Sequence, residues 1–341
     1  MAENIVKTQP TAAALHIDRP LTDVSVAYIQ NQDDFIADKV FKPIKSDRQS
    51  NMYYIFEKEY FFRGGDELQV AETSGTLGGG FGLTTGTYVC KVYGTHELIS
   101  DEMRANADEG INLDHTATLL ITSRLLITKE KEFAKVAFNK DAWSFAVDGA
   151  SAAGAKAFKY WSDDESNPIN DIRKAKMAVK RRTGYTPNTL VISEAVFERL
   201  TQHPKIIDRY KYTTANVITA EMIAKLLDLK TIEVAKAIAL PNAVAEKSTA
   251  AKDNDNYTWI MENGALLLYV PDSVSVMQAA SGYGFYWTGL AGVGTSEKGV
   301  AIKTYRMEHK RADVVEGLCS FAYKIICEDL GYFFNGCLEE V

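Results

Sequence analysis

The residue types that often build active sites are present in this chain, but their spacing matches no known chemistry. Five glycines fall within 75–82, a run that resembles a phosphate-binding loop. A dinucleotide fingerprint starting at Gly78 would need glycine where Leu83 stands, and no Gly-Lys-Ser/Thr follows. A second glycine cluster, starting at Gly282, fails at Trp287 in the same way. We interpret the first run as a loop and the second as a packed turn, with a binding loop as the alternative.

The histidines and carboxylates do not predict a metal or acid–base site. No two of the five histidines have the spacing of metal ligands. These histidines are His16, His96, His115, His203 and His309. The run 253–256 resembles the start of a calcium loop, but Tyr257 and Thr258 occupy the next ligand and glycine positions. We therefore expect no catalytic, cofactor-binding or metal-binding residues and no enzyme activity, and we leave open a site assembled from distant residues.

Two clusters of charge have ordinary structural explanations. The acidic stretch 163–165 is typical of a solvated linker. A basic run is the best candidate for contact with nucleic acid, although a solvated face near a helix C-terminus is the favoured interpretation. It comprises Lys174, Lys176, Lys180, Arg181 and Arg182.

The overall composition excludes some classes of function. A net charge of -7 argues against tight duplex binding, which needs clustered cations, but it allows the protein to enclose DNA loosely. The four cysteines form no CxxC pair, so we expect buried, reduced thiols. The first ten residues lack the apolar core of a signal peptide, and the apolar run 265–270 is too short to cross a bilayer. We expect a soluble protein made in the cytoplasm.

Hydrophobic periodicity divides the chain into segments. Residues 1–45 resemble an extended arm with a short helix that ends before Pro43, and such an arm needs a neighbouring surface to order it. Residues 46–100 predict a long two-stranded excursion rich in Tyr and Phe. A helix is expected over 113–138, about 39 Å long at about 1.5 Å per residue. Alternating helices and strands predict an α/β module over 166–271. The tail returns to strands.

The order of these segments resembles the major capsid proteins of tailed phages, which have the Hong Kong 97-type fold. The resemblance covers most of the chain and rests on short strings in a consistent order. These strings are Phe35 to Pro43, the Tyr/Phe-rich segment through Arg63, the helix 113–138, Pro187 to Ile192, His203 to Arg209, Ala265 to Pro271, Tyr283 to Gly289 and Asp329 to Phe334.

The resemblance implies an α+β fold with an N-terminal arm, an extended β-hairpin loop, a peripheral domain with a long spine helix and strands, and an α/β axial domain. The arm would span 1–45 and the extended loop 46–100. The peripheral domain would combine 101–165 and 272–341, and the axial domain would span 166–271.

The same resemblance implies a shell subunit. It would assemble with itself into pentamers and hexamers and form the icosahedral or prolate head of a virion around double-stranded DNA. A portal, and scaffolding or decoration proteins, would be its other partners, and contact with DNA would be weak and non-specific. No membrane is implied. An encapsulin-like compartment shell is the first alternative, and a soluble α/β enzyme is the second.

Five aromatic residues of the extended loop are the candidates for intersubunit contacts. An isolated hairpin is only marginally stable in water, so another surface must cover its aromatic side. Packing within the same subunit is an equally weighted alternative. The candidates are Tyr53, Tyr54, Phe56, Phe61 and Phe62.

Overall fold

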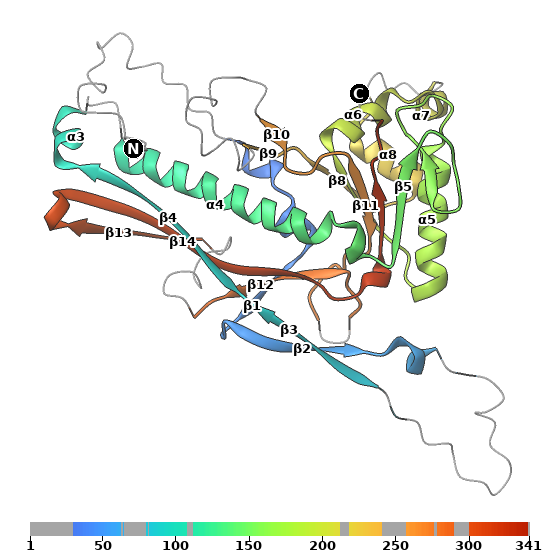
Figure 1. Cartoon of the computed structure of the whole chain (residues 1–341), viewed down its shortest axis with the longest axis horizontal. Helices are drawn as coiled ribbons and strands as arrows, with labels where there is room; N and C mark the ends of the chain where they lie inside the picture. Colours follow the sequence, from blue (N-terminus) through green and yellow to red (C-terminus); the bar gives the residue numbers. More distant parts are fainter. Residues whose placement is uncertain are drawn as a thin grey trace, which may run out of the picture.

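The structure is a computed structural model of the chain. It describes residues 30–62, 64, 80, 82–107, 112–211, 218–240, 257–275, 278–289 and 300–339. Figure 1 shows a compact α/β part beside a long helix, an elongated sheet along that helix, and a two-stranded ribbon that extends below the sheet. Most of the glycine-rich run 75–82 and the whole of 253–256 lie outside the described residues.

A six-stranded sheet forms the centre of the α/β part. Its spatial order is β6 (Ala157–Lys159), β5 (Phe145–Ala150), β15 (Gly331–Asn335), β11 (Gly264–Leu268), β7 (Thr189–Ser193) and β8 (Thr231–Ala235). Strands β7 and β11 are buried at every position, which agrees with the apolar runs 190–192 and 265–268 that they contain. Three strands of this sheet come from outside 166–271, so the α/β unit is larger than the predicted axial segment. The division into named domains stays a prediction.

Helices cover one face of this sheet. They are α5 (Pro168–Thr183), α6 (Glu194–Gln202), α7 (Pro204–Tyr210) and α8 (Ala220–Leu227). Their apolar sides share one core with Leu190, Leu267 and Phe334. Asn167, Ser193 and Thr219 each cap a helix N-terminus through the side chain, as these residue types favour.

The other face of the same sheet packs against the long helix. Helix α4 (Leu113–Ala137) is capped by Asn112 and matches the predicted span to within one residue. Its buried stripe includes Ile121, Leu125 and Phe133, and it joins the core that contains Leu266 and Phe333 of the sheet. The spine helix and this face of the sheet therefore share one hydrophobic core, which is distinct from the core under α5 to α8.

A second sheet supports α4 along most of its length. Strand β14 (Ala312–Ile325) pairs with β4 (Lys91–Ser100) on one side. On its other side it pairs with β13 (Val300–Met307) and then with β12 (Gly282–Trp287). A Cβ at Gly317 would lie 2.2 Å from Ile121, so only glycine allows α4 to approach β14 this closely. The β13–β14 register runs without interruption from Val300 to Met307.

Residues 30–46 pack onto their own chain. Short helix α2 (Ala37–Val40) follows the 3-10 turn η2 (Gln32–Asp34), and strand β1 (Pro43–Ser46) pairs in parallel with β12. The side chains of Ile36 and Phe41 are buried, and the Phe41 ring meets Phe133 edge-on at 5.1 Å. This part of the predicted arm therefore needs no neighbouring subunit to order it, because α4 and the second sheet cover its apolar residues. Residues 1–29 lie outside the described residues.

The projecting ribbon consists of β2 (Ser50–Phe56) and β3 (Leu83–Val89), which pair with each other. The 3-10 turn η3 (Lys58–Phe61) follows β2 in the chain. The two strands of the ribbon pair only with each other among the described strands. The remaining described elements are α3 (Asp101–Asn106), the short strands β9 (Ile238–Ala239) and β10 (Thr258–Trp259), and the 3-10 turns η5 (Lys140–Ala142), η9 (Glu308–Lys310) and η10 (Glu328–Leu330).

Candidate intersubunit surface

The base of the β2–β3 ribbon is anchored by stacked aromatic rings. Tyr88 lies against Phe285 of β12, with ring centroids 3.9 Å apart and an angle of 8° between the planes. Tyr53 stacks on the same ring at 5.8 Å. A Cβ at Gly86, the cross-strand partner of Tyr53, would lie 2.4 Å from the tyrosine ring, so glycine leaves the space in which that ring lies. One face of the ribbon therefore packs against its own subunit.

The opposite face of the ribbon is exposed and apolar. Side chains alternate between the two faces of a strand, so Met52, Tyr54 and Phe56 point away from the face that carries Tyr53. Across the ribbon, Leu83 and Val89 belong to this outer face as well. Exposed fractions are 63% for Met52, 66% for Tyr54, 44% for Leu83 and 57% for Val89. We call these four residues, with Phe56, the outer ribbon face.

Two further aromatic side chains extend this surface beyond β2. Phe61 is 56% exposed and touches Phe56 edge-on, with ring centroids 6.3 Å apart. Phe62 is 63% exposed, and its ring lies close to Gly184 at the C-terminus of α5. Contiguous exposed apolar side chains of this kind mark a surface that a partner covers.

A set of ion pairs holds this end of the ribbon close to the α/β part. Asp329 of η10 pairs with Lys58 of η3, and its other carboxylate oxygen lies 2.8 Å from Arg182 Nε at the end of α5. The Asp329 side chain is only 14% exposed, so this contact is screened less than a surface ion pair. We call the three residues the ribbon latch.

The five predicted residues therefore fall into two groups. Tyr53 packs within its own subunit, and Phe56 is half-buried beside Phe61. Tyr54, Phe61 and Phe62 are exposed. Met52, Leu83 and Val89 belong to the same exposed surface but were missed, although the alternation along β2 and β3 could have indicated them.

Ser166 and His203 lie together as a nucleophile and a base would in a catalytic site. Ser166 Oγ lies 3.0 Å from His203 Nε2, and both side chains are buried. The Nδ1 atom of His203 accepts a hydrogen bond from the amide of Lys205, so the neutral ring carries its proton on Nε2. A ring in that state donates toward Ser166 and cannot take its proton. Burial also lowers the pKa of His203. This pair is structural.

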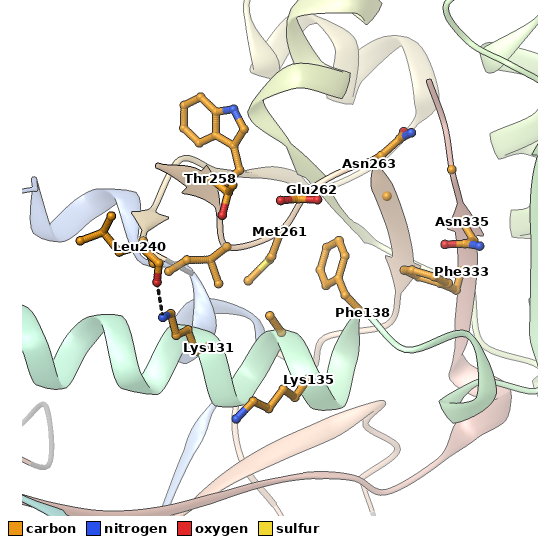
Figure 2. Close-up of a pocket in the computed structure, with 16 residues that line it drawn as sticks. Lys131, Lys135, Phe138, Leu240, Thr258, Met261, Glu262, Asn263, Phe333 and Asn335 are labelled. Atoms are coloured by element: carbon orange, nitrogen blue, oxygen red, sulfur yellow. Dashed lines mark hydrogen bonds between the residues drawn. The ribbon is translucent and has the colours of Figure 1, made fainter. Parts of the chain in front are cut away.

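A hollow of about 660 Å³ lies between the C-terminal half of α4 and strands β9 and β10 (Figure 2). Phe138, Met261 and Phe333 line it together with Lys135, Glu262 and Asn263. Lys131 bridges one side of it by donating to the carbonyl of Leu240 at 3.0 Å. The described residues of its lining include no histidine or cysteine and no nucleophile paired with a base. No group of histidine, cysteine or acidic residues suited to a metal ion occurs among the described residues.

Comparisons with known proteins point to one class. The family model described as Phage major capsid protein E matches residues 144–270, which include most of the α/β part. The major capsid protein of Burkholderia phage BcepMu is 21% identical over 328 residues, which covers 94% of this chain and 96% of the relative.

Solved structures share the architecture over almost the whole length. A phage-related protein from Bordetella bronchiseptica aligns with a TM-score of 0.67 and 22% identity, covering 90% of this chain and 93% of that one. A capsid structure of Cyanophage P-SCSP1u aligns with a TM-score of 0.57 and 10% identity, covering 93% and 91%. The chain has the fold of tailed-phage capsid proteins. The resemblance inferred from the sequence and the Hong Kong 97-type fold are confirmed.

The same fold occurs in a compartment shell. A holo encapsulin complex from Synechococcus elongatus aligns with a TM-score of 0.54 and 10% identity, covering 93% of both chains. Fold likeness alone therefore does not separate a capsid from an encapsulin, whereas the family model and the BcepMu relative are both phage major capsid proteins. No helix in the described parts of the chain is long and apolar enough to cross a membrane.

Proposed function

We propose that this chain is the major capsid protein of a tailed phage, located in the virion. It assembles with itself into pentamers and hexamers, which form an icosahedral or prolate head shell around double-stranded DNA. A portal and scaffolding or decoration proteins would be its further partners. The observation that carries the proposal is the outer ribbon face, an exposed apolar surface on an arm that projects from a capsid fold.

The physical argument begins with the cost of leaving that surface in water. Burial of apolar surface stabilises an interface by about 25 cal/mol per Å². Contacts between different patches of identical subunits close rings and can then tile a surface. A ribbon whose outer face is exposed, while its base and its end are held by its own chain, is suited to such a contact.

The deciding experiment expresses the full chain and examines it by sedimentation and electron microscopy. Closed shells or capsomer rings are expected, whereas a uniform small species under all conditions would refute assembly and favour the enzyme alternative.

Particles that contain DNA and a portal, when the chain is expressed with its neighbouring genes, distinguish a phage head from an encapsulin. Shells loaded with cargo protein and lacking DNA would favour the encapsulin.

A double variant tests the role of the outer ribbon face and of its extension at Phe61. Tyr54→Ser with Phe61→Ser should prevent shell formation and leave the subunit folded, because both side chains are exposed in the free subunit. Tyr305→Ser on β13, where the side chain is 41% exposed, is the matched control and should assemble normally. Far-ultraviolet circular dichroism reports the fold and sedimentation reports the assembly. Normal shells from the double variant would refute the contact role of these two residues.

A further inference from the structure

Helix α5 carries a band of positive charge that the shell contacts above do not use. Its buried side includes Ile172, Ala175 and Val179, which pack toward the six-stranded sheet. The exposed positions recur every three to four residues on the opposite side, so they form one stripe. The exposed cations of the stripe are Arg173, Lys174, Lys180 and Arg181. From the first to the last they extend about 12 Å along the helix, at about 1.5 Å per residue.

The structure separates these cations from the others in the basic run. Lys176 is buried, and its ammonium group donates to the carbonyl of Leu227 at 3.0 Å and to Asp228. Arg182 belongs to the ribbon latch and lies over the ring of Phe145 at 5.2 Å. Lys176 and Arg182 therefore hold the fold together, and the remaining cations of the run are available at the surface.

The band continues into a hollow of about 450 Å³ beside the start of α5. Arg173, Lys205 and Arg209 contribute cations to its lining, and Asp208 is the one carboxylate among the lining residues. Lys205 is oriented by a 2.7 Å hydrogen bond from its ammonium group to the carbonyl of Glu165. Within the described residues, no ion pair neutralises Arg173 or Arg209, and the same holds for the other three exposed cations of α5.

This local excess of cations contrasts with the chain as a whole, whose net charge is -7. We infer that the band, Arg173, Lys174, Lys180 and Arg181 with Lys205 and Arg209 at its end, contacts the phosphate backbone of the packaged DNA. The inference rests on the proposed function and names the surface through which that weak contact is made. Arginine and lysine side chains recognise phosphate without reading base sequence, as a lining that meets every part of a genome requires.

Few phosphates are contacted at once, and the chain as a whole has a net charge of -7, so the expected affinity is low and strongly dependent on salt. For duplex DNA the logarithm of the binding constant falls with the logarithm of salt concentration by about 0.9 for each phosphate contacted. A band that makes three or four contacts therefore predicts a slope of roughly -3.

The test uses full-length subunits before assembly and a duplex of about 20 base pairs. The band variant changes Arg173→Gln, Lys174→Gln, Lys180→Gln and Arg181→Gln, since glutamine favours helix nearly as well as lysine or arginine. The matched control removes the same charge elsewhere, at four exposed lysines without an ion pair among the described residues. These changes are Lys45→Gln, Lys91→Gln, Lys310→Gln and Lys324→Gln.

Binding is followed by fluorescence anisotropy between about 20 and 200 mM salt, a range in which counterion release dominates affinity. The band variant should lose about tenfold in affinity at the lowest salt and most of its salt slope, whereas the control should retain the slope. Equal losses in both variants, or no measurable binding by the unmodified chain, would overturn the inference.

Sedimentation of the same samples separates this inference from the proposed function. Band-variant shells that assemble but bind no duplex as subunits support the DNA contact. A band variant that binds duplex normally but forms no shells would show that the band is an interface between copies of the chain, and it would overturn the inference. Failure of the unmodified chain to form shells would count against the proposed function instead.

Discussion

Glu130 is a carboxylic acid that is almost completely buried in α4, with 1% of the residue exposed. Its two oxygens accept hydrogen bonds from the amides of Ile36 and Ala37, at 3.2 and 3.1 Å, and so hold the start of α2 against the spine helix. Burial raises the pKa of Glu130 to about 7, although these two amides act in the opposite direction.

Neighbouring polar side chains continue this buried connection. Asp38 accepts hydrogen bonds from the hydroxyls of Tyr286 and Tyr323, and its other oxygen lies 2.5 Å from the ammonium group of Lys129. Burial raises the pKa of both tyrosines well above the usual range, so they remain donors. Residues from α2, α4, β12 and β14 are joined in one network, which orients the N-terminal segment.

The raised pKa of Glu130 predicts how the stability of the fold depends on pH. Between the unfolded pKa of about 4.5 and the folded pKa of about 7, the folded state keeps a proton that the unfolded state has lost. The contribution of Glu130 is therefore fully present below pH 4.5 and is lost as pH rises through 7. Its size is on the order of 3 kcal/mol.

Replacement of Glu130 by glutamine should remove this contribution. We expect the difference in unfolding free energy between Glu130→Gln and the unmodified chain to change with pH between about 5 and 8, in favour of the variant at high pH. Urea unfolding at several pH values measures it, and the exposed change Glu59→Gln is the control. If the difference in unfolding free energy stays constant across this pH range, the pKa of Glu130 is not raised in the folded state.

At the scale of elements, the ribbon is held by two unlike contacts. Aromatic stacking on Phe285 holds its base, and the ribbon latch at Asp329 holds η3 near α5. The stacked rings are buried, whereas Lys58 and Arg182 are about half exposed. The latch should therefore open more readily than the base, which would let the outer part of the ribbon move as a unit.

Asp329→Asn tests this difference, because asparagine keeps the shape of the side chain but removes its charge. We expect hydrogen exchange to become about three- to tenfold faster at the amides of 54–58, corresponding to a local loss of about 1 kcal/mol. Exchange near Tyr88 should not change. Loss of protection throughout the chain would mean instead that the buried carboxylate supports the whole fold.

For the whole molecule, the shared core and the projecting ribbon predict different behaviour in free and assembled states. One hydrophobic core includes α2, α4 and strands of both sheets, so the body should unfold as a unit. The ribbon has no such support on its outer face. Assembly that covers this face stabilises the folded chain by mass action, because the unfolded chain does not bind its neighbours.

Scanning calorimetry should therefore show a higher unfolding temperature for assembled shells than for free subunits. The rise should be several degrees, since a ligand present at 100 times its dissociation constant contributes about 2.7 kcal/mol. The double variant Tyr54→Ser and Phe61→Ser should unfold near the temperature of free wild-type subunits at every protein concentration. Shells that melt at the same temperature as free subunits would argue against substantial burial on assembly.

Features of local sequence were sufficient to predict much of the architecture. The span of α4 and the helix starts at Asn167, Ser193 and Thr219 follow from periodicity and from side-chain caps that act within three residues. The paired strands of the ribbon follow from alternation and aromatic content. The ordered set of short strings was enough to indicate a capsid fold.

Other features depend on residues far apart in the sequence and required the folded chain. Tyr53 and Tyr54 are adjacent, yet one stacks on Phe285 and the other is exposed, because only the position of β12 distinguishes the two faces of β2. Lys176 and Lys180 look alike in the sequence. Lys176 donates to the carbonyl of Leu227 and is buried, whereas the side chain of Lys180 is exposed to solvent. Burial and charge pairing are set by long-range contacts, and local pattern does not encode their partners.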